Sequence, residues 1–105
     1  MPALKEKVDM NLSQLIQQKR RQVLEIAAGH GARNVRLFGS VARGETTETS
    51  NLDLLIEMEP ERTLLDIVAI KQDLEELLGC KGDVVTEAAI SPYLRDKMLH
   101  EAVRL

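Results

Sequence analysis

The chain has 105 residues, of which 44% are apolar and 30% are charged, a balance typical of one folded globular domain. Its net charge of −3 argues against a protein that binds nucleic acid through bulk positive charge, because such domains are usually basic. No apolar run approaches the length of a membrane span, and with Phe38 and Tyr93 as the aromatic residues we expect no base-stacking platform.

We therefore expect a single domain over residues 1–105, with an ordered core from about residue 11 onward. The first residues lack the hydrophobic stretch of a secretory signal peptide. The single Cys80 excludes an internal disulfide, which fits a reducing compartment. These features predict a cytoplasmic protein that does not bind membranes.

Apolar residues at helical spacing predict a first helix over residues 11–28. Residues 34–38 alternate between apolar and polar side chains and predict a short strand. We expect the dipeptide Gly39-Ser40 to end this strand in a tight turn, because glycine tolerates the backbone angles that tight turns require.

After a polar stretch over residues 44–50, the apolar run at 52–56 predicts a buried strand. A second helix is predicted over residues 63–78, with Thr63 and Asp66 as a capping box at its start. Its core-facing side is expected to carry Leu64, Ile67, Val68, Leu74, Leu77 and Leu78.

Residues 83–86 predict a third strand, and Ser91 followed by Pro92 predicts the start of a last helix that runs through Val103. We expect Tyr93 to pack near the start of that helix. The order of elements predicts an α/β fold, a small mixed sheet of about three or more strands flanked by helices.

The strand that ends at Gly39-Ser40 is the first candidate for chemistry. A strand that turns tightly at a glycine leaves backbone N–H groups around a small concavity, and such concavities bind phosphate. Ser40 adds a hydroxyl donor, and Arg43 adds a positive charge nearby. The sequence thus predicts a phosphate cradle at these residues.

The second candidate is a set of oxygen-bearing side chains that follow. Asn51 and Asp53 are two residues apart, so on a strand both side chains point to the same face. Asp83 opens the third strand and adds a carboxylate beside them if that strand pairs with the second. Such oxygen ligands opposite a phosphate cradle suit a hard divalent cation.

This arrangement resembles the nucleotidyltransferase superfamily that includes DNA polymerase beta. The resemblance is greatest to the minimal nucleotidyltransferases, which occur as antitoxins beside HEPN-domain ribonuclease toxins. The family pattern is Gly-Ser, ten residues, then Asp-x-Asp, and here Gly39-Ser40 is followed by ten residues and then Asn51-Leu52-Asp53. The flanking Leu37-Phe38 and the residues 42–45 also match.

The resemblance implies the minimal nucleotidyltransferase fold and an antitoxin of a type VII-like HEPN/MNT pair, in a hetero-oligomer with its toxin. The implied activity is transfer of AMP from ATP to a tyrosine of the cognate HEPN toxin, which neutralises it. Gly39, Ser40 and Arg43 then bind the nucleotide. Asn51, Asp53 and Asp83 are the implied catalytic residues and the ligands of two Mg²⁺ ions.

The chain departs from the family pattern at Asn51, where the motif has its first aspartate. An amide oxygen brings no charge, so we expect weaker Mg²⁺ binding and weakened or abolished catalysis. The sequence leaves open whether Asn51 is natural or was introduced to trap an inactive enzyme.

Two other functions remain open from the sequence. One is a noncatalytic antitoxin that masks the toxin surface, which Asn51 favours. The other is a nucleotidyltransferase that acts on RNA or a small molecule. His30, His100 and Cys80 have no partners at the spacing of a metal site or catalytic pair, and they are interpreted as structural or solvated residues.

Overall fold

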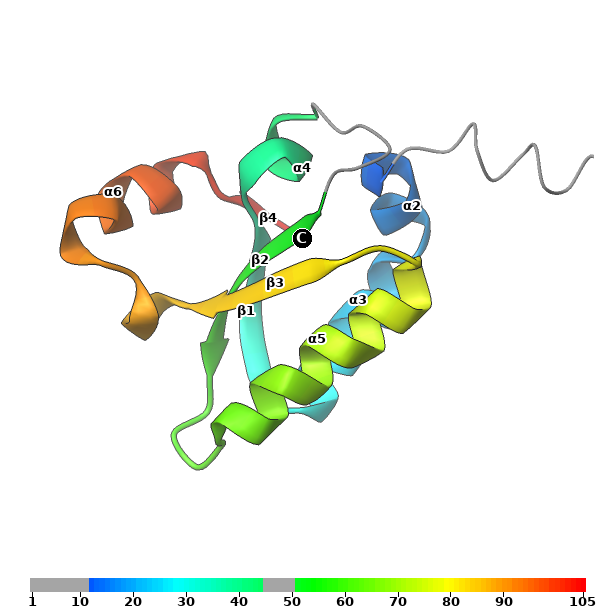
Figure 1. Ribbon diagram of the computed structural model, residues 1–105, viewed down its shortest axis with the longest axis horizontal. Coiled ribbons are helices and arrows are strands. Elements are labelled where there is room, and N and C mark those ends of the chain that lie inside the picture. Colours follow the sequence, from blue (N-terminus) through cyan, green and yellow to red (C-terminus); the bar gives the residue numbers. More distant parts are fainter. Residues whose placement is uncertain (1–11, 45–50) are drawn as a thin grey trace, which may run out of the picture.

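The computed structural model describes residues 12–44 and 51–105 (Figure 1). In chain order the described elements are α2 (Leu12–Gln18), α3 (Arg20–Gly29), β1 (Ala32–Leu37), α4 (Gly39–Arg43), β2 (Leu52–Met58), α5 (Leu64–Leu78), β3 (Gly82–Thr86), the 3₁₀ turn η1 (Glu87–Ala89), α6 (Pro92–Glu101) and β4 (Val103–Arg104). In the part of the chain that the structure describes, no helix is long and apolar enough to cross a membrane.

The four described strands form one mixed sheet in the order β3-β2-β1-β4. β2 runs parallel to β3, whereas β1 is antiparallel to both β2 and β4. Because β2 and β3 are joined through α5, the parallel pair has the helical crossover that such a connection requires. The predicted α/β fold with a small mixed sheet is confirmed.

The hydrophobic core lies between one face of this sheet and the helices α2, α3 and α5. α3 and α5 lie beside each other against the sheet, and α6 lies on the other side (Figure 1). The core is built from aliphatic side chains, including Ile16, Val23, Leu54, Ile56, Ile70 and Leu74. Close packing of branched aliphatic residues thus compensates for the scarcity of aromatic residues.

The predicted first helix is two helices that meet at Lys19. The Lys19 backbone N–H still donates to the Leu15 carbonyl, and its carbonyl accepts from the Val23 N–H, both at 3.0 Å. The backbone at Lys19 leaves the helical region, with ψ at 18°. The helical spacing therefore predicted correctly which residues are helical, but a kink at Lys19 divides the predicted helix into α2 and α3. Residue 11, its predicted first position, lies outside the described residues.

The capping box of α5 is confirmed. The Thr63 hydroxyl accepts a hydrogen bond from the Leu65 N–H, and the Asp66 carboxylate accepts one from the Thr63 N–H, both at 3.2 Å. The predicted core side is wrong in the first turns, where Leu64 is 76% and Val68 47% exposed. The reason is that α5 diverges from β3 toward its first turn (Figure 1), so its buried core residues begin at Ile70 and continue with Leu74 and Leu78.

The last helix ends at Glu101 and not at Val103 as predicted. Val103 belongs to β4, which pairs with β1, and the Leu105 backbone N–H donates to the Val35 carbonyl at 3.0 Å. The edge of β1 that does not pair with β2 has backbone N–H and C=O groups that need partners. Residues 103–105 provide these partners in an extended conformation, which a helical turn cannot do. The expectation that Tyr93 packs is also wrong, since this residue is 95% exposed.

Candidate functional site

The Gly39-Ser40 dipeptide follows β1 and begins a short helix, α4, where the sequence predicted only a tight turn. Phe38, between β1 and α4, donates its backbone N–H to the Asp53 carbonyl at 3.1 Å. Gly39 has a φ of +73°, a backbone angle that residues with a Cβ rarely adopt. The glycine therefore lets the chain turn out of the sheet directly beside β2.

Gly39 also makes room for the Asp53 side chain. A Cβ at Gly39 would lie 2.7 Å from Oδ2 of Asp53, closer than carbon and oxygen atoms approach without a bond. The Asp53 carboxylate thus lies against the backbone of Gly39. Ser40, the next residue, is half-buried. The two halves of the sequence motif, separated by a loop outside the described residues, meet in space.

Asp53 and Asp83 are neighbours on the parallel strands β2 and β3. They are paired in register, two positions before Leu55 pairs with Val85, so their side chains lie on one face of the sheet. This is the face opposite to the α3–α5 core, since Leu54 and Val84 point into that core. The condition set by the sequence, that the third strand pairs with the second, is met.

Two effects raise the pKa of the Asp53 carboxyl above its ordinary value. Burial is the larger effect, and the nearby charge of Asp83 adds to it. Both disfavour the ionised form of the Asp53 carboxyl. A cation bound between the two carboxylates would remove this electrostatic penalty, so the site is electrostatically suited to a positive ion.

Asn51 and Arg43 lie at the border of the site. Asn51 is exposed and precedes β2, whose pairing with β3 begins with a hydrogen bond from the Leu52 N–H to the Lys81 carbonyl at 2.9 Å. It is therefore not itself a strand residue, in contrast to the sequence expectation. Arg43 is the exposed last residue of α4, at the opposite end of that helix from Gly39.

Across residues 12–44 and 51–105, no group of three or more His, Cys, Asp or Glu side chains is arranged to hold a metal ion. The oxygen donors at the predicted site are the two carboxylates of Asp53 and Asp83, with the amide of Asn51 at the position of the motif's first aspartate. This donor set fits a hard cation that keeps most of its own water ligands, as Mg²⁺ does.

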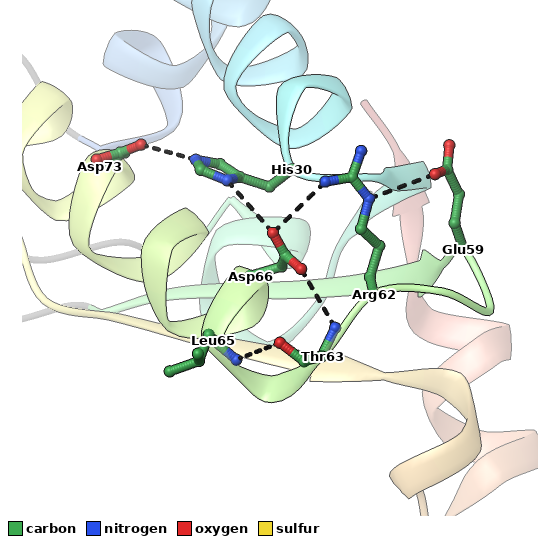
Figure 2. A network of polar contacts seen from close by, with 7 residues as sticks. All are labelled: His30, Glu59, Arg62, Thr63, Leu65, Asp66 and Asp73. Carbon is green, nitrogen blue, oxygen red and sulfur yellow. Dashed lines mark hydrogen bonds and ion pairs between the residues drawn. The ribbon is translucent and has the colours of Figure 1, made fainter.

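The structure shows a polar network that the sequence did not predict (Figure 2). His30 Nε2 lies 3.1 Å from Oδ2 of Asp73, and Nδ1 lies 3.8 Å from Oδ1 of Asp66. Arg62 lies 3.6 Å from the same Asp66 oxygen and 3.4 Å from Glu59. The network connects the end of α3 to α5, away from Asp53, and so gives His30 a structural role, as the sequence indicated.

The sequence matches the family described as the nucleotidyltransferase domain over residues 16–105. Two archaeal proteins are among its relatives. A predicted protein adenylyltransferase of Methanocaldococcus jannaschii is 42% identical over 94 residues, which cover 90% of this chain and 97% of that protein. The protein adenylyltransferase MntA of Thermococcus cleftensis is 33% identical over 79 residues, which cover 75% of this chain and 80% of that protein.

Two solved structures have the same fold. One is described as a predicted minimal nucleotidyltransferase, with a TM-score of 0.84 and 47% identity over 92% of this chain and 98% of that one. The other is a crystal structure of a toxin–antitoxin with AMP-PNP, with a TM-score of 0.70 over 80% of this chain and 69% of that one. At 16% identity the second match shows a shared fold alone.

Proposed function

This chain belongs to the nucleotidyltransferase domain family and is a nucleotidyltransferase, and we propose that it transfers AMP from ATP to a protein. The acceptor is a tyrosine of a cognate HEPN ribonuclease toxin, so that the chain acts as the antitoxin of a type VII-like pair. The observation that carries the proposal is the meeting of Gly39 with Asp53 and Asp83 at one end of the sheet.

The nucleotide binds where α4 begins. The first N–H groups of a helix have no partner within the helix, so those at the start of α4 can donate to a phosphate. Ser40 adds its hydroxyl, and Arg43 contributes positive charge to the same region. Bound AMP-PNP in a protein of the same fold, and two relatives named as protein adenylyltransferases, support this choice of substrate.

Asp53, Asp83 and the amide of Asn51 are the residues that hold Mg²⁺. When bound, Mg²⁺ supplies positive charge against the charge that develops on the phosphate oxygens during transfer. The raised pKa of Asp53 and its position beside Asp83 support this assignment, because two adjacent carboxylates are stabilised by a cation. The neutral Asn51 lowers the negative charge of the site by one compared with the family motif.

The reaction is a displacement at the α-phosphate of ATP. The tyrosine oxygen of the toxin forms a bond to the α-phosphorus, the bond to the β-phosphate oxygen breaks, and pyrophosphate leaves. We assign to the Asp53 carboxylate the role of accepting the proton of the attacking hydroxyl. Gly39 and Ser40 hold the β- and γ-phosphates so that the leaving group lies in line.

Asn51 supports a second candidate function in which the chain neutralises its toxin by binding alone. If the missing carboxylate abolishes transfer, the remaining protein still has the surface of an antitoxin. The two functions differ in one requirement, because neutralisation by binding needs neither ATP nor Mg²⁺.

The experiment that tests the proposal measures transfer of labelled AMP from ATP to the purified toxin. We expect Asn51→Asp to raise the rate by about 100-fold or more, since it restores a carboxylate ligand. The matched control is Asn51→Asp combined with Asp53→Asn, which has the same charge as the natural chain and is expected to lose the gain. Equal transfer by the natural chain and Asn51→Asp would show that the metal assignment is wrong.

A further inference from the structure

A pocket of about 610 Å³ opens at the end of β2 that lies away from Gly39 and Asp53. Its lining includes three arginines and two glutamates together with apolar residues of α5. We call it the arginine pocket and define it by Arg33, Glu57, Arg62, Leu64, Glu87 and Arg95. The positive excess is notable because the chain as a whole has a net charge of −3.

Two of the three arginines of the pocket, Arg33 and Arg95, are only loosely paired, whereas Arg62 contacts the carboxylates of Glu59 and Asp66. Arg33 lies 3.9 Å from Glu57, and its side chain is 68% exposed. Arg95 lies 3.8 Å from Glu87 and is 55% exposed. These nitrogen–oxygen distances exceed the range of a good hydrogen bond, so both guanidinium groups retain donors for another carboxylate.

Glu87 is largely committed to a different arginine. Its carboxylate accepts a hydrogen bond from Arg36 at 2.9 Å, and both side chains are mostly buried. Arg36 therefore neutralises most of the negative charge of Glu87. As a result, Glu87 neutralises little of the positive charge of Arg95, which lies at the open side of the pocket. The exposed guanidinium groups of Arg33 and Arg95 are therefore the positive charges that the pocket offers to an approaching partner.

An apolar surface adjoins the pocket on the first turns of α5. Leu64, which lines the pocket, is 76% exposed, Leu65 is 79% exposed and Val68 is 47% exposed. They occur where α5 diverges from the sheet (Figure 1). Neighbouring exposed aliphatic side chains beside a pocket are typical of a surface that binds protein.

We propose that the arginine pocket and the leucines of α5 form the docking surface for a segment of the protein partner with aliphatic and acidic side chains. The partner's carboxylates meet Arg33 and Arg95, and its aliphatic side chains cover Leu64 and Leu65. A nucleic acid matches the arginines but offers no apolar surface to the leucines. A symmetric dimer through this surface would bring the arginines of two copies together.

The position of this surface suits a partner that is also a substrate. Glu57 and Asp53 are four residues apart on β2 and point to the same face of the sheet, so they lie about 13 Å from each other along the strand. A partner helix of about nine residues spans that length. Docking at the pocket therefore leaves the site at Asp53 open to another part of the same partner.

This inference rests on the proposed function for the identity of the partner, which is the toxin. Its test is the affinity of the purified, unmodified toxin for the chain, measured by calorimetry without ATP or Mg²⁺. We expect Leu64→Ser combined with Leu65→Ser to weaken binding about tenfold or more. Gln72→Ser combined with Glu76→Ser, on the solvent-facing side of the same helix farther along, is the matched control and should bind like the natural chain.

A second pair of variants tests the charge. Arg33→Glu combined with Arg95→Glu should weaken binding more at low salt than at high salt, whereas Arg21→Glu, 91% exposed on α3, should change it little. Equal affinity for all these variants would overturn the inference while leaving AMP transfer to the toxin unaffected. The inference would also be overturned if the free chain formed a dimer in sedimentation that depends on Leu64 and Leu65. It would likewise be overturned if the chain bound an RNA oligonucleotide, and not the toxin, through Arg33 and Arg95.

Discussion

Gly39 joins the two parts of the candidate site, because its missing side chain leaves space for the Asp53 carboxylate. We predict that Gly39→Ala destabilises the fold by about 1–3 kcal/mol, from backbone strain at φ +73° and from the contact with Asp53. Gly44→Ala is the matched control, since Gly44 has a φ of +72° but no atom of the described residues within 4 Å of an added Cβ. Urea unfolding of both variants measures the difference. Equal losses would show that the Asp53 contact contributes nothing.

Asp53 gives a prediction for pH dependence. Its raised pKa means that the folded chain holds a proton on this carboxyl more readily than the unfolded chain does. The stability that this provides is complete below the ordinary aspartate pKa of about 3.9, and it is lost as the pH rises through the higher pKa of the folded state.

Asp53→Asn should therefore unfold with a larger free energy than the natural chain at pH 7, by up to about 1 kcal/mol, with the difference vanishing near pH 3. Asp83→Asn should raise the free energy of unfolding at pH 7 by less, because it removes the exposed charge that faces Asp53 but leaves the half-buried Asp53 carboxyl in place. Urea unfolding at both pH values tests this. An Asp53→Asn variant that is less stable than the natural chain at pH 7 would contradict it.

Single residues also show where sequence information ends. The spacing from Gly39-Ser40 to Asp53 predicted a meeting of distant residues that the structure shows, because the motif encodes a three-dimensional contact. The exposure of Leu64 and Tyr93 was not predictable, since a leucine or tyrosine on a helix gives no sign of whether another element covers it. The contacts of His30 with α5 depend likewise on how two helices pack.

Among the elements, α5 has the clearest start. Thr63→Ala removes the hydroxyl that accepts from the Leu65 N–H, and we expect it to lower the free energy of unfolding by about 1 kcal/mol. Thr63→Ser keeps an acceptor at the same place and should lose much less. Thermal and urea unfolding compare the two variants. A loss as large for serine as for alanine would assign the effect to the threonine methyl group and not to the cap.

The sequence predicted strands and helices well where local signals such as capping residues are strong. It predicted them less well where contacts with distant parts of the chain determine the conformation. The capping residues predicted the starts of α5 and α6, alternation predicted β1, and a continuous apolar run predicted β2. β4 was missed because two residues carry no periodic pattern, and their strand conformation comes from pairing with β1. The same holds for α4, whose helical turn follows from the geometry of Gly39 beside β2.

At the scale of the whole molecule, the two faces of the sheet have different tasks. One face and the helices α2, α3 and α5 form the hydrophobic core, which provides the stability. The other face carries Asp53 and Asp83 at one end, and the arginine pocket, lined by Glu57 of this face together with the start of α5, lies at the other end of β2. In our account the chemistry and the docking of the partner are thus separated along β2, so variants of the pocket should alter affinity without altering the site.

The central claim is that Asp53, Asp83 and the Gly39-Ser40 backbone together bind a divalent cation and ATP. Its most direct test is paramagnetic broadening of backbone amide signals by Mn²⁺ in the presence of a nonhydrolysable ATP analogue. We predict that the signals of Ser40, Asp53 and Asp83 broaden first, that Gly29 at the far end of α3 broadens least, and that Asp53→Asn combined with Asp83→Asn abolishes the effect. Broadening centred elsewhere, or unchanged in that double variant, would contradict the account.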